Sequence, residues 1–273
     1  MQDEGNGRAA KPGPGSIDTT KPSIARAYDV VLGGKDNYKV DRAVADQLRQ
    51  TMPHIDDLAW LNREALGRTV RHLTAEAGID QLIDLGAGLP TMENTHQVAQ
   101  RHLPGARVVY VDNDPIVLAH GRALLQENDD TFVITADLRR PREILEHPDV
   151  RRLIDFSRPV AILLVGILHH LHDDEDPQGI VDAYMDAVPS GSHLVITHFC
   201  DVGEEAQALQ DTFLSFLGTG RFRTVAEIES YFTGLDLLEP GVVSLPHWRP
   251  DKPVRTDLKL FERLMAGGVG RKP

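Results

Sequence analysis

The stretch LIDLGAGLPTMENTH, residues 82–96, is the most informative segment of this chain. An apolar run carries Asp84 near its end, and Gly86 and Gly88 follow directly before a helical pattern. Glycines in a strand-to-helix turn let the backbone turn sharply and approach a ligand without interference from a Cβ atom. Because Gly-x-Gly alone is a weak signal, its meaning depends on the segments around it.

Downstream of this stretch, short apolar runs alternate with helical patterns over most of the chain. Runs of this kind predict strands that are buried on both faces of a parallel sheet, so we expect an α/β fold. A ligand of such a sheet binds at the carboxyl ends of the strands. The runs are QLIDL (81–85), RVVYV (107–111), TFVIT (131–135), PVAILLV (159–165) and SHLVITHF (192–199).

The N-terminal part of the chain has a different character. Residues 1–21 are polar and rich in glycine and proline, so we expect a disordered tail. Helical patterns then predict a helical cap over residues 22–78. Residues 79–273 form the expected ligand-binding domain, which contains the alternating runs.

Composition excludes several classes of protein. The net charge of −12 over 273 residues opposes binding to nucleic acid, whose affinity comes mostly from Lys and Arg on phosphates. A single cysteine, Cys200, rules out an internal disulfide framework, which suits the cytoplasm. The longest apolar run, residues 160–168, is too short to cross a bilayer, so no membrane partner is expected.

The second apolar run ends in acids that point to a nucleoside ligand. Asp112 closes this run and can accept hydrogen bonds from both hydroxyls of a ribose, with Asn113 beside it. A loop acid without a ligand is the alternative, but the strand, the spacing and the glycine loop together favour the ribose. Asp114 precedes Pro115, which is typical of a helix N-cap.

The glycine loop itself argues against a dinucleotide. A dinucleotide fingerprint places a third glycine where this chain has Thr91, so that a helix N-terminus meets the pyrophosphate. Pro90 also removes a backbone N–H from the loop. The loop therefore favours an adenosyl ligand without phosphate, such as S-adenosylmethionine (SAM). No tyrosine is followed four residues later by the lysine that short-chain dehydrogenases use.

The third apolar run is followed by a further candidate for cofactor binding. Asp137 can accept a hydrogen bond from an adenine amino group, and the Leu138 amide can meet a ring nitrogen. The alternative for Asp137 is a surface turn acid before Pro141. Its position at the same sheet edge as the glycine loop favours the cofactor.

With these residues placed, the chain resembles a class I SAM-dependent methyltransferase. More narrowly, it resembles the bacterial S-adenosyl methyltransferase family, formerly a domain of unknown function. This resemblance implies a Rossmann-like sheet of seven strands in the order 3-2-1-4-5-7-6, with the last strand antiparallel, and SAM as cofactor. The resemblance does not specify a substrate. The motifs that carry it include ARAYDVVLGGKDNY, LNREALGRTVRHL, IDLGAGLPTMENTHQVAQ, VVYVDNDPIVLAHGRALL and RPVAILLVGILHHL.

Several residues outside the strand ends are candidates for the remaining contacts. Arg63 could pair with the cofactor carboxylate, or form an ion pair on its helix surface. Tyr28, Asn37 or Tyr38 could line the cofactor or acceptor pocket. Alternatively, Gly33 and Gly34 form a plain helix C-cap and Tyr38 is a core aromatic. Trp248 could wall the acceptor site, although a loop anchored by one buried indole is the favoured interpretation.

The segment ILHHLHDDED, residues 167–176, carries the candidate catalytic groups. A metal site needs ligands that converge from separated positions, whereas neighbouring side chains fan outward, so no metal is expected. His169 or His170 could instead accept a proton from an incoming nucleophile. A packing histidine in a solvated acidic turn is slightly favoured for each of them.

The leading hypothesis is therefore a SAM-dependent methyltransferase that acts on an unidentified small-molecule acceptor. A non-catalytic SAM-binding regulatory protein would show the same glycine loop and Asp112. An NAD-dependent oxidoreductase is weakened by Thr91 and by the missing Tyr/Lys pair. The sequence does not specify the oligomeric state.

Overall fold

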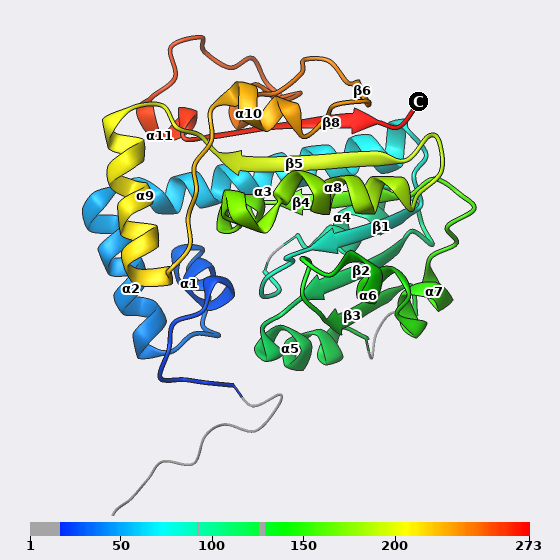
Figure 1. The fold of residues 1–273 in the computed structure, drawn as a ribbon, viewed down its shortest axis with the longest axis horizontal. Helices are drawn as coiled ribbons and strands as arrows, with labels where there is room; N and C mark the ends of the chain where they lie inside the picture. Colours follow the sequence, from blue (N-terminus) through cyan, green and yellow to red (C-terminus); the bar gives the residue numbers. More distant parts are fainter. Residues whose placement is uncertain (1–16, 92, 126–128) are drawn as a thin grey trace, which may run out of the picture.

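The computed structural model describes residues 17–91, 93–125 and 129–273, and its centre is one twisted sheet with helices on both faces (Figure 1). Residues 1–16 of the expected tail lie outside the described residues. The strands are β1 (Gln81–Leu85), β2 (Arg107–Asp112), β3 (Thr131–Thr135), β4 (Ala161–Val165), β5 (His193–Phe199), β6 (Asp236–Leu237), β7 (Val243–Ser244) and β8 (Met265–Arg271).

The sheet has the order β3-β2-β1-β4-β5-β8-β6. Strands β1 to β5 are parallel, and β8 runs antiparallel to β5, with His193 opposite Arg271 and Phe199 opposite Met265. This is the arrangement that the resemblance implies. The described residues contain one strand more than expected, because the two-residue β7 also pairs with β8.

Helices cover both faces of the sheet and cap one edge of it (Figure 1). Short 3-10 turns lie at Leu168–His170, Asp173–Glu175 and Leu245–His247, and a π-helical turn at His72–Glu76 extends α3. The helices are α1 (Ile24–Val31), α2 (Lys39–Thr51), α3 (Ile55–Arg71), α4 (Thr95–His102), α5 (Pro115–Leu125), α6 (Pro141–Leu145), α7 (Pro148–Leu153), α8 (Pro177–Asp186), α9 (Glu204–Leu217), α10 (Val225–Ser230) and α11 (Leu260–Arg263).

The alternation of side chains along β1 shows why this strand is apolar on both sides. Ile83 and Leu85 pack into the core under α6, α7, α8 and α10, whereas Leu82 packs into the core under α3, α4 and α5. Successive residues of a strand point to opposite faces, so both faces of a central strand must be apolar. Asp84 is the exception. Burying a carboxylate at the strand end is costly, which indicates that this residue does not serve packing of the core.

A third apolar cluster forms the cap. It joins α1, α2 and the first half of α3 to α9, a helix that follows β5. The hydroxyls of Thr51 on α2 and Thr212 on α9 are 2.9 Å apart. The cap is thus built from two separate parts of the sequence, which the range 22–78 does not capture.

The second half of α3 belongs to the sheet rather than to the cap. Leu66, Val70 and Leu73 pack in the core cluster of β1 and β4. The guanidinium of Arg26, in the first turn of α1, donates to the carbonyl oxygens of Asp18 and Lys21, which precede the helix. The described residues 17–21, expected in the tail, therefore contact α1.

Candidate functional site

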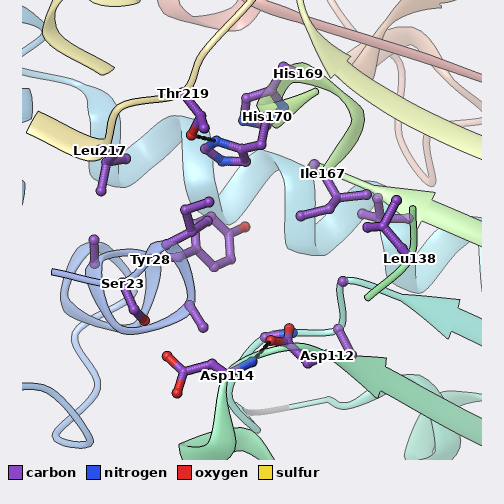
Figure 2. A pocket seen from close by; sticks show the side chains of 18 of the residues that line it. Ser23, Tyr28, Asp112, Asp114, Leu138, Ile167, His169, His170, Leu217 and Thr219 are labelled. Atoms are coloured by element: carbon purple, nitrogen blue, oxygen red, sulfur yellow. Dashed lines mark hydrogen bonds between the residues drawn. The ribbon is translucent and has the colours of Figure 1, made fainter. Parts of the chain in front are cut away.

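A cavity of about 400 Å³ lies at the carboxyl edge of the sheet, where the strand order reverses between β1 and β4. Its floor is the glycine loop and the ends of β1, β2, β3 and β4, and its roof is the cap. Figure 2 shows Asp112 at one side, His170, Thr219 and Leu217 at the opposite side, and Tyr28 between them. The edge is the one at which parallel sheets bind ligands.

The two glycines of the loop are required by its backbone. Gly86 and Gly88 have φ values of +73° and +67°, which L side chains rarely adopt. A Cβ atom on Gly86 would lie 2.4 Å from Cγ1 of Ile167, so a side chain there has no room. The amide of Gly88 donates a 2.8 Å hydrogen bond to Oδ2 of Asp112, which ties the loop to the end of β2.

Asp112 is 9% exposed and lines the cavity. Its Oδ1 accepts a 2.9 Å hydrogen bond from the amide of Asp114, and burial raises the pKa of its carboxyl group. A carboxylate offers about four lone-pair positions. The amides of Gly88 and Asp114 use two of them and the Asn113 amide also contributes, so acceptor capacity remains for a ligand hydroxyl. Asp114 accepts from the amide of Ile116, in agreement with the N-cap prediction.

The start of α4 is not prepared for a phosphate. The amide of Asn94 donates to the side chain of Gln97 at 2.9 Å, and the amide of His96 donates to the hydroxyl of Tyr110 at 2.8 Å. The amide of Thr91 donates to the side chain of Asn94. These donors are the ones that a helix N-terminus would offer to a pyrophosphate. The loop therefore fits an adenosyl ligand without phosphate.

Asp84 is a second buried acid at the cavity wall. Its Oδ2 accepts a 2.7 Å hydrogen bond from the hydroxyl of Thr95, the first residue of α4. Burial raises the pKa of Asp84 to about 6, an effect that the Thr95 hydrogen bond and the positive charge of Arg63 reduce. The carboxylate is thus held in the charged form at neutral pH at a cost to stability.

This cost predicts a pH-dependent effect of Asp84→Asn. The folded protein keeps the Asp84 proton up to about pH 6, whereas the unfolded chain releases it near its ordinary pKa of 3.8. The contribution of Asp84 to the free energy of unfolding of the wild type therefore falls as pH rises from 4 through 6. We expect urea unfolding to give Asp84→Asn a free energy of unfolding roughly 2–3 kcal/mol higher than that of wild type at pH 7.5. At pH 4 the two values should differ little.

The exposed Asp186→Asn variant on α8 is the control for the Asp84 experiment, because its carboxyl lies at the surface. It should follow the wild-type pH dependence at both pH values. An Asp84→Asn effect of equal size at pH 4 and pH 7.5 would contradict the raised pKa.

The remaining candidates for cofactor binding also border the cavity. Asn113, Asp137 and Leu138 line it beside β2 and β3. Both carboxylate oxygens of Asp137 accept from the guanidinium of Arg139, which lowers the pKa of Asp137. Arg63 lines the cavity from α3, and its Nη2 donates to the carbonyl of Glu93 at 2.9 Å.

On the cap side, Tyr28 lines the cavity as the sequence suggests, with a partner that the sequence analysis missed. The Tyr28 hydroxyl donates to the carbonyl of Ala59 and accepts from the side-chain amide of Asn62, each at 3.2 Å. Asn62 in turn accepts a 2.7 Å hydrogen bond from Thr197 on β5. A Cβ on Gly166, just after β4, would lie 3.0 Å from Asn62. Asn62 lies in the motif LNREALGRTVRHL beside Arg63, but nothing in that motif indicates its contact with Thr197.

His169 and His170 both line the cavity, in different surroundings (Figure 2). Nδ1 of His170 is 2.9 Å from the hydroxyl of Thr219, and burial lowers the pKa of His170 to about 3. His169 packs edge-on against Phe199 and Phe213, and burial lowers its pKa well below the ordinary value. Both imidazoles are therefore neutral at physiological pH.

Three candidate acceptor residues lie away from the cavity lining. Asn37 donates to Asp29 at 2.8 Å, and the amide of Tyr38 donates to Asp41 at the start of α2. Trp248 is 2% exposed and packs in the core cluster on the α3 face of the sheet. The structure thus places Trp248 in the core and packs Tyr38 against the same cluster, which were the alternatives for these two residues, whereas Asn37 contacts α1.

The acidic turn after His170 makes ion pairs. Asp173 is bound by Arg223 at 2.7 Å and by Arg221 at 3.1 Å. Within the described ranges, no group of three or more histidine, cysteine or acidic side chains is arranged to hold a metal ion. The same ranges contain no helix whose length and apolar character would let it cross a membrane.

The sheet order, the glycine loop and the buried acid at the end of β2 define the class I SAM-dependent methyltransferase fold. The chain belongs to the S-adenosyl methyltransferase family, whose sequence profile matches residues 10–273. The protein is accordingly a SAM-dependent methyltransferase. A comparison with curated protein sequences found no match.

Solved structures agree with this assignment. A protein from Thermobifida fusca with a methyltransferase assignment is 52% identical, with a TM-score of 0.91 over 93% of this chain and 96% of that chain. A DUF574 family protein from Streptomyces avermitilis is 38% identical, with a TM-score of 0.90 over 94% and 100%. An O-methyltransferase family protein from Burkholderia thailandensis, 13% identical, shares only the fold (TM-score 0.53 over 85% and 59%).

Proposed function

We propose that this enzyme transfers the methyl group of SAM to a small-molecule acceptor that binds under the cap. The observation that supports this proposal is a single continuous cavity. It runs from the acids beside the glycine loop to an apolar compartment between α1, α2, α3 and α9. A small molecule in that compartment would lie beside a cofactor at the sheet edge.

The proposed cofactor contacts match each part of SAM to the polar groups that line the cavity beside it. Asp112 accepts from the ribose hydroxyls, and the backbone at Gly86 and Gly88 lies along the methionine part. Asp137 accepts from the adenine amino group, the Leu138 amide meets a ring nitrogen, and Asn113 borders the adenosine. Arg63 pairs with the carboxylate, since its guanidinium fork suits that group. Asp84 supports the amino-acid end from below the loop.

SAM supplies an electrophilic methyl group on a sulfonium, so the chain needs to orient the acceptor and exclude water. Orientation alone can lower the barrier by several kcal/mol. We propose that His170 accepts a hydrogen bond from the acceptor at Nε2, in the tautomer in which Nδ1–H donates to Thr219 and Nε2 carries no proton. With a pKa near 3, it is a weak general base, so positioning is its main contribution. His169 supports the ring of His170 at a centroid distance of 4.2 Å.

Thermal unfolding with added ligands tests the cofactor part of this proposal. S-adenosylhomocysteine at 100 times its Kd should stabilise the protein by about 2.7 kcal/mol, which raises Tm by roughly 5–10 °C. NAD should leave Tm unchanged, because the α4 amides are already paired. Transfer of a labelled SAM methyl group to a small-molecule extract tests turnover. A Tm shift with NAD alone would contradict the proposal.

A further inference from the structure

The charged residues that line the cavity are confined to one part of it. They are Arg63, Asp84, Asp112, Asp114, Asp137 and Arg139. All of them lie at the glycine loop or beside the ends of β1, β2 and β3, where the cofactor is proposed to bind. Among the described residues that line the rest of the cavity, there is no Asp, Glu, Lys or Arg.

The cap compartment, by contrast, is apolar. Leu48, Ile55, Phe213 and Met265 are buried in its wall, and Leu217 at the end of α9 is half-buried there. They come from α2, α3, α9 and β8, so four elements contribute apolar surface to one space. An apolar ligand gains affinity in such a space in proportion to the area it buries.

The polar groups of the compartment are neutral and mostly paired with one another. The Tyr28 hydroxyl is shared between Ala59 and Asn62, and His170 is bonded to Thr219. These groups offer single hydrogen bonds to a ligand but no counter-charge. An ionised ligand group would lose its hydration without an ionic partner, which is costly.

We infer that the acceptor is an uncharged, ring-sized, mainly apolar compound that carries a hydroxyl group. This inference rests on the proposed function and adds the substrate class. In the transfer, the hydroxyl oxygen forms the new bond to the methyl carbon, and the electron pair of the broken carbon–sulfur bond stays on sulfur. The hydroxyl proton leaves to solvent. Ionised carboxylates and protonated amines are excluded, because the compartment offers them no partner.

Three probes that share one ring system test this class directly. They are 1-naphthol, 1-naphthoate and 1-naphthylmethylammonium, which are neutral, anionic and cationic at neutral pH. Calorimetry on the full chain saturated with S-adenosylhomocysteine should show the neutral probe binding more than about tenfold tighter than either ion. Equal or tighter binding of an ion, or no binding of any probe, would overturn the inference.

A charge placed in the wall sharpens the test. Leu217→Lys should weaken 1-naphthol and strengthen 1-naphthoate, and so shift their affinity ratio by about tenfold or more. Leu214→Lys is the matched control, since Leu214 lies on the same helix, is 37% exposed and is not part of the cavity lining. It should leave the ratio at the wild-type value. If Leu217→Lys leaves the ratio of the two affinities unchanged, the probes bind outside the compartment and the inference is overturned.

The outcome for the substrate class can be separated from the outcome for the proposed function. If S-adenosylhomocysteine fails to bind, the proposed function fails before any probe is added. If it binds and the anionic or cationic probe is preferred, the methyl-transfer proposal stands and the inferred acceptor class is wrong.

Discussion

Replacing Asp112 by asparagine is expected to weaken the binding of S-adenosylhomocysteine about 100-fold or more. The carboxylate is proposed to accept from both ribose hydroxyls, and hydrogen bonds to charged groups contribute about 1.5–3 kcal/mol each. The NH2 group of an asparagine would also face the amide of Gly88 or of Asp114. In the wild type both of these amides donate to Asp112. Calorimetric titration of wild type and variant gives the two affinities.

The control for this experiment is Asp186→Asn, which removes a surface carboxylate from α8. It should bind S-adenosylhomocysteine as wild type does. Thermal unfolding of both variants without ligand shows whether Asp112→Asn is still folded at the titration temperature. An affinity within threefold of wild type, in a folded variant, would refute the assignment of Asp112 to the ribose.

Replacing Arg223 by leucine is expected to cause a large loss of stability. Arg223 is 4% exposed, and its guanidinium donates to Asp173 at 2.7 Å and lies 3.1 Å from Nε2 of His198. It also donates to the carbonyls of Leu168 and Leu171, which flank the two candidate histidines. Asp173 is 66% exposed and water can replace its lost partner, so the cost comes from the buried carbonyls and His198, which lose their donor. Each unpaired buried polar group costs about 1–3 kcal/mol, so Tm should fall on the order of 10 °C.

Arg221→Leu provides a closely matched control, because Arg221 contacts the same Asp173 from a position that is 36% exposed. Exposed ion pairs contribute about 0–1 kcal/mol, so this variant should lose little stability in urea unfolding. Equal losses of stability for the two variants would contradict this prediction, because the buried position of Arg223 beside the Leu168–His170 turn would then have no special importance.

The sequence was most informative where backbone geometry restricts the residue type. Gly86 and Gly88 have positive φ values, and the apolar runs mark strands buried on both faces, so sheet and loop could both be predicted. The mismatch at Pro90 and Thr91 was also informative. The chain satisfies the helix amides there with Asn94 and Gln97, where a dinucleotide would bring a phosphate.

The cap side was harder to predict, because its contacts join residues that are distant in sequence. Asn62 binds Thr197 across 135 positions, and α9 completes a cap that begins at α1. Neither feature leaves a local pattern. The aromatic and amide residues Tyr38, Asn37 and Trp248 illustrate the opposite difficulty, because polar or aromatic character alone does not show whether a side chain faces a cavity, a helix end or the core.

A crystal structure of the full chain with S-adenosylhomocysteine tests the central claim most directly. We expect the ribose hydroxyls within hydrogen-bond distance of Asp112 and the sulfur facing the compartment beside Tyr28 and Asn62. A ligand that binds elsewhere, or a sulfur that faces away from the cap, would contradict the proposed site and the methyl transfer assigned to it.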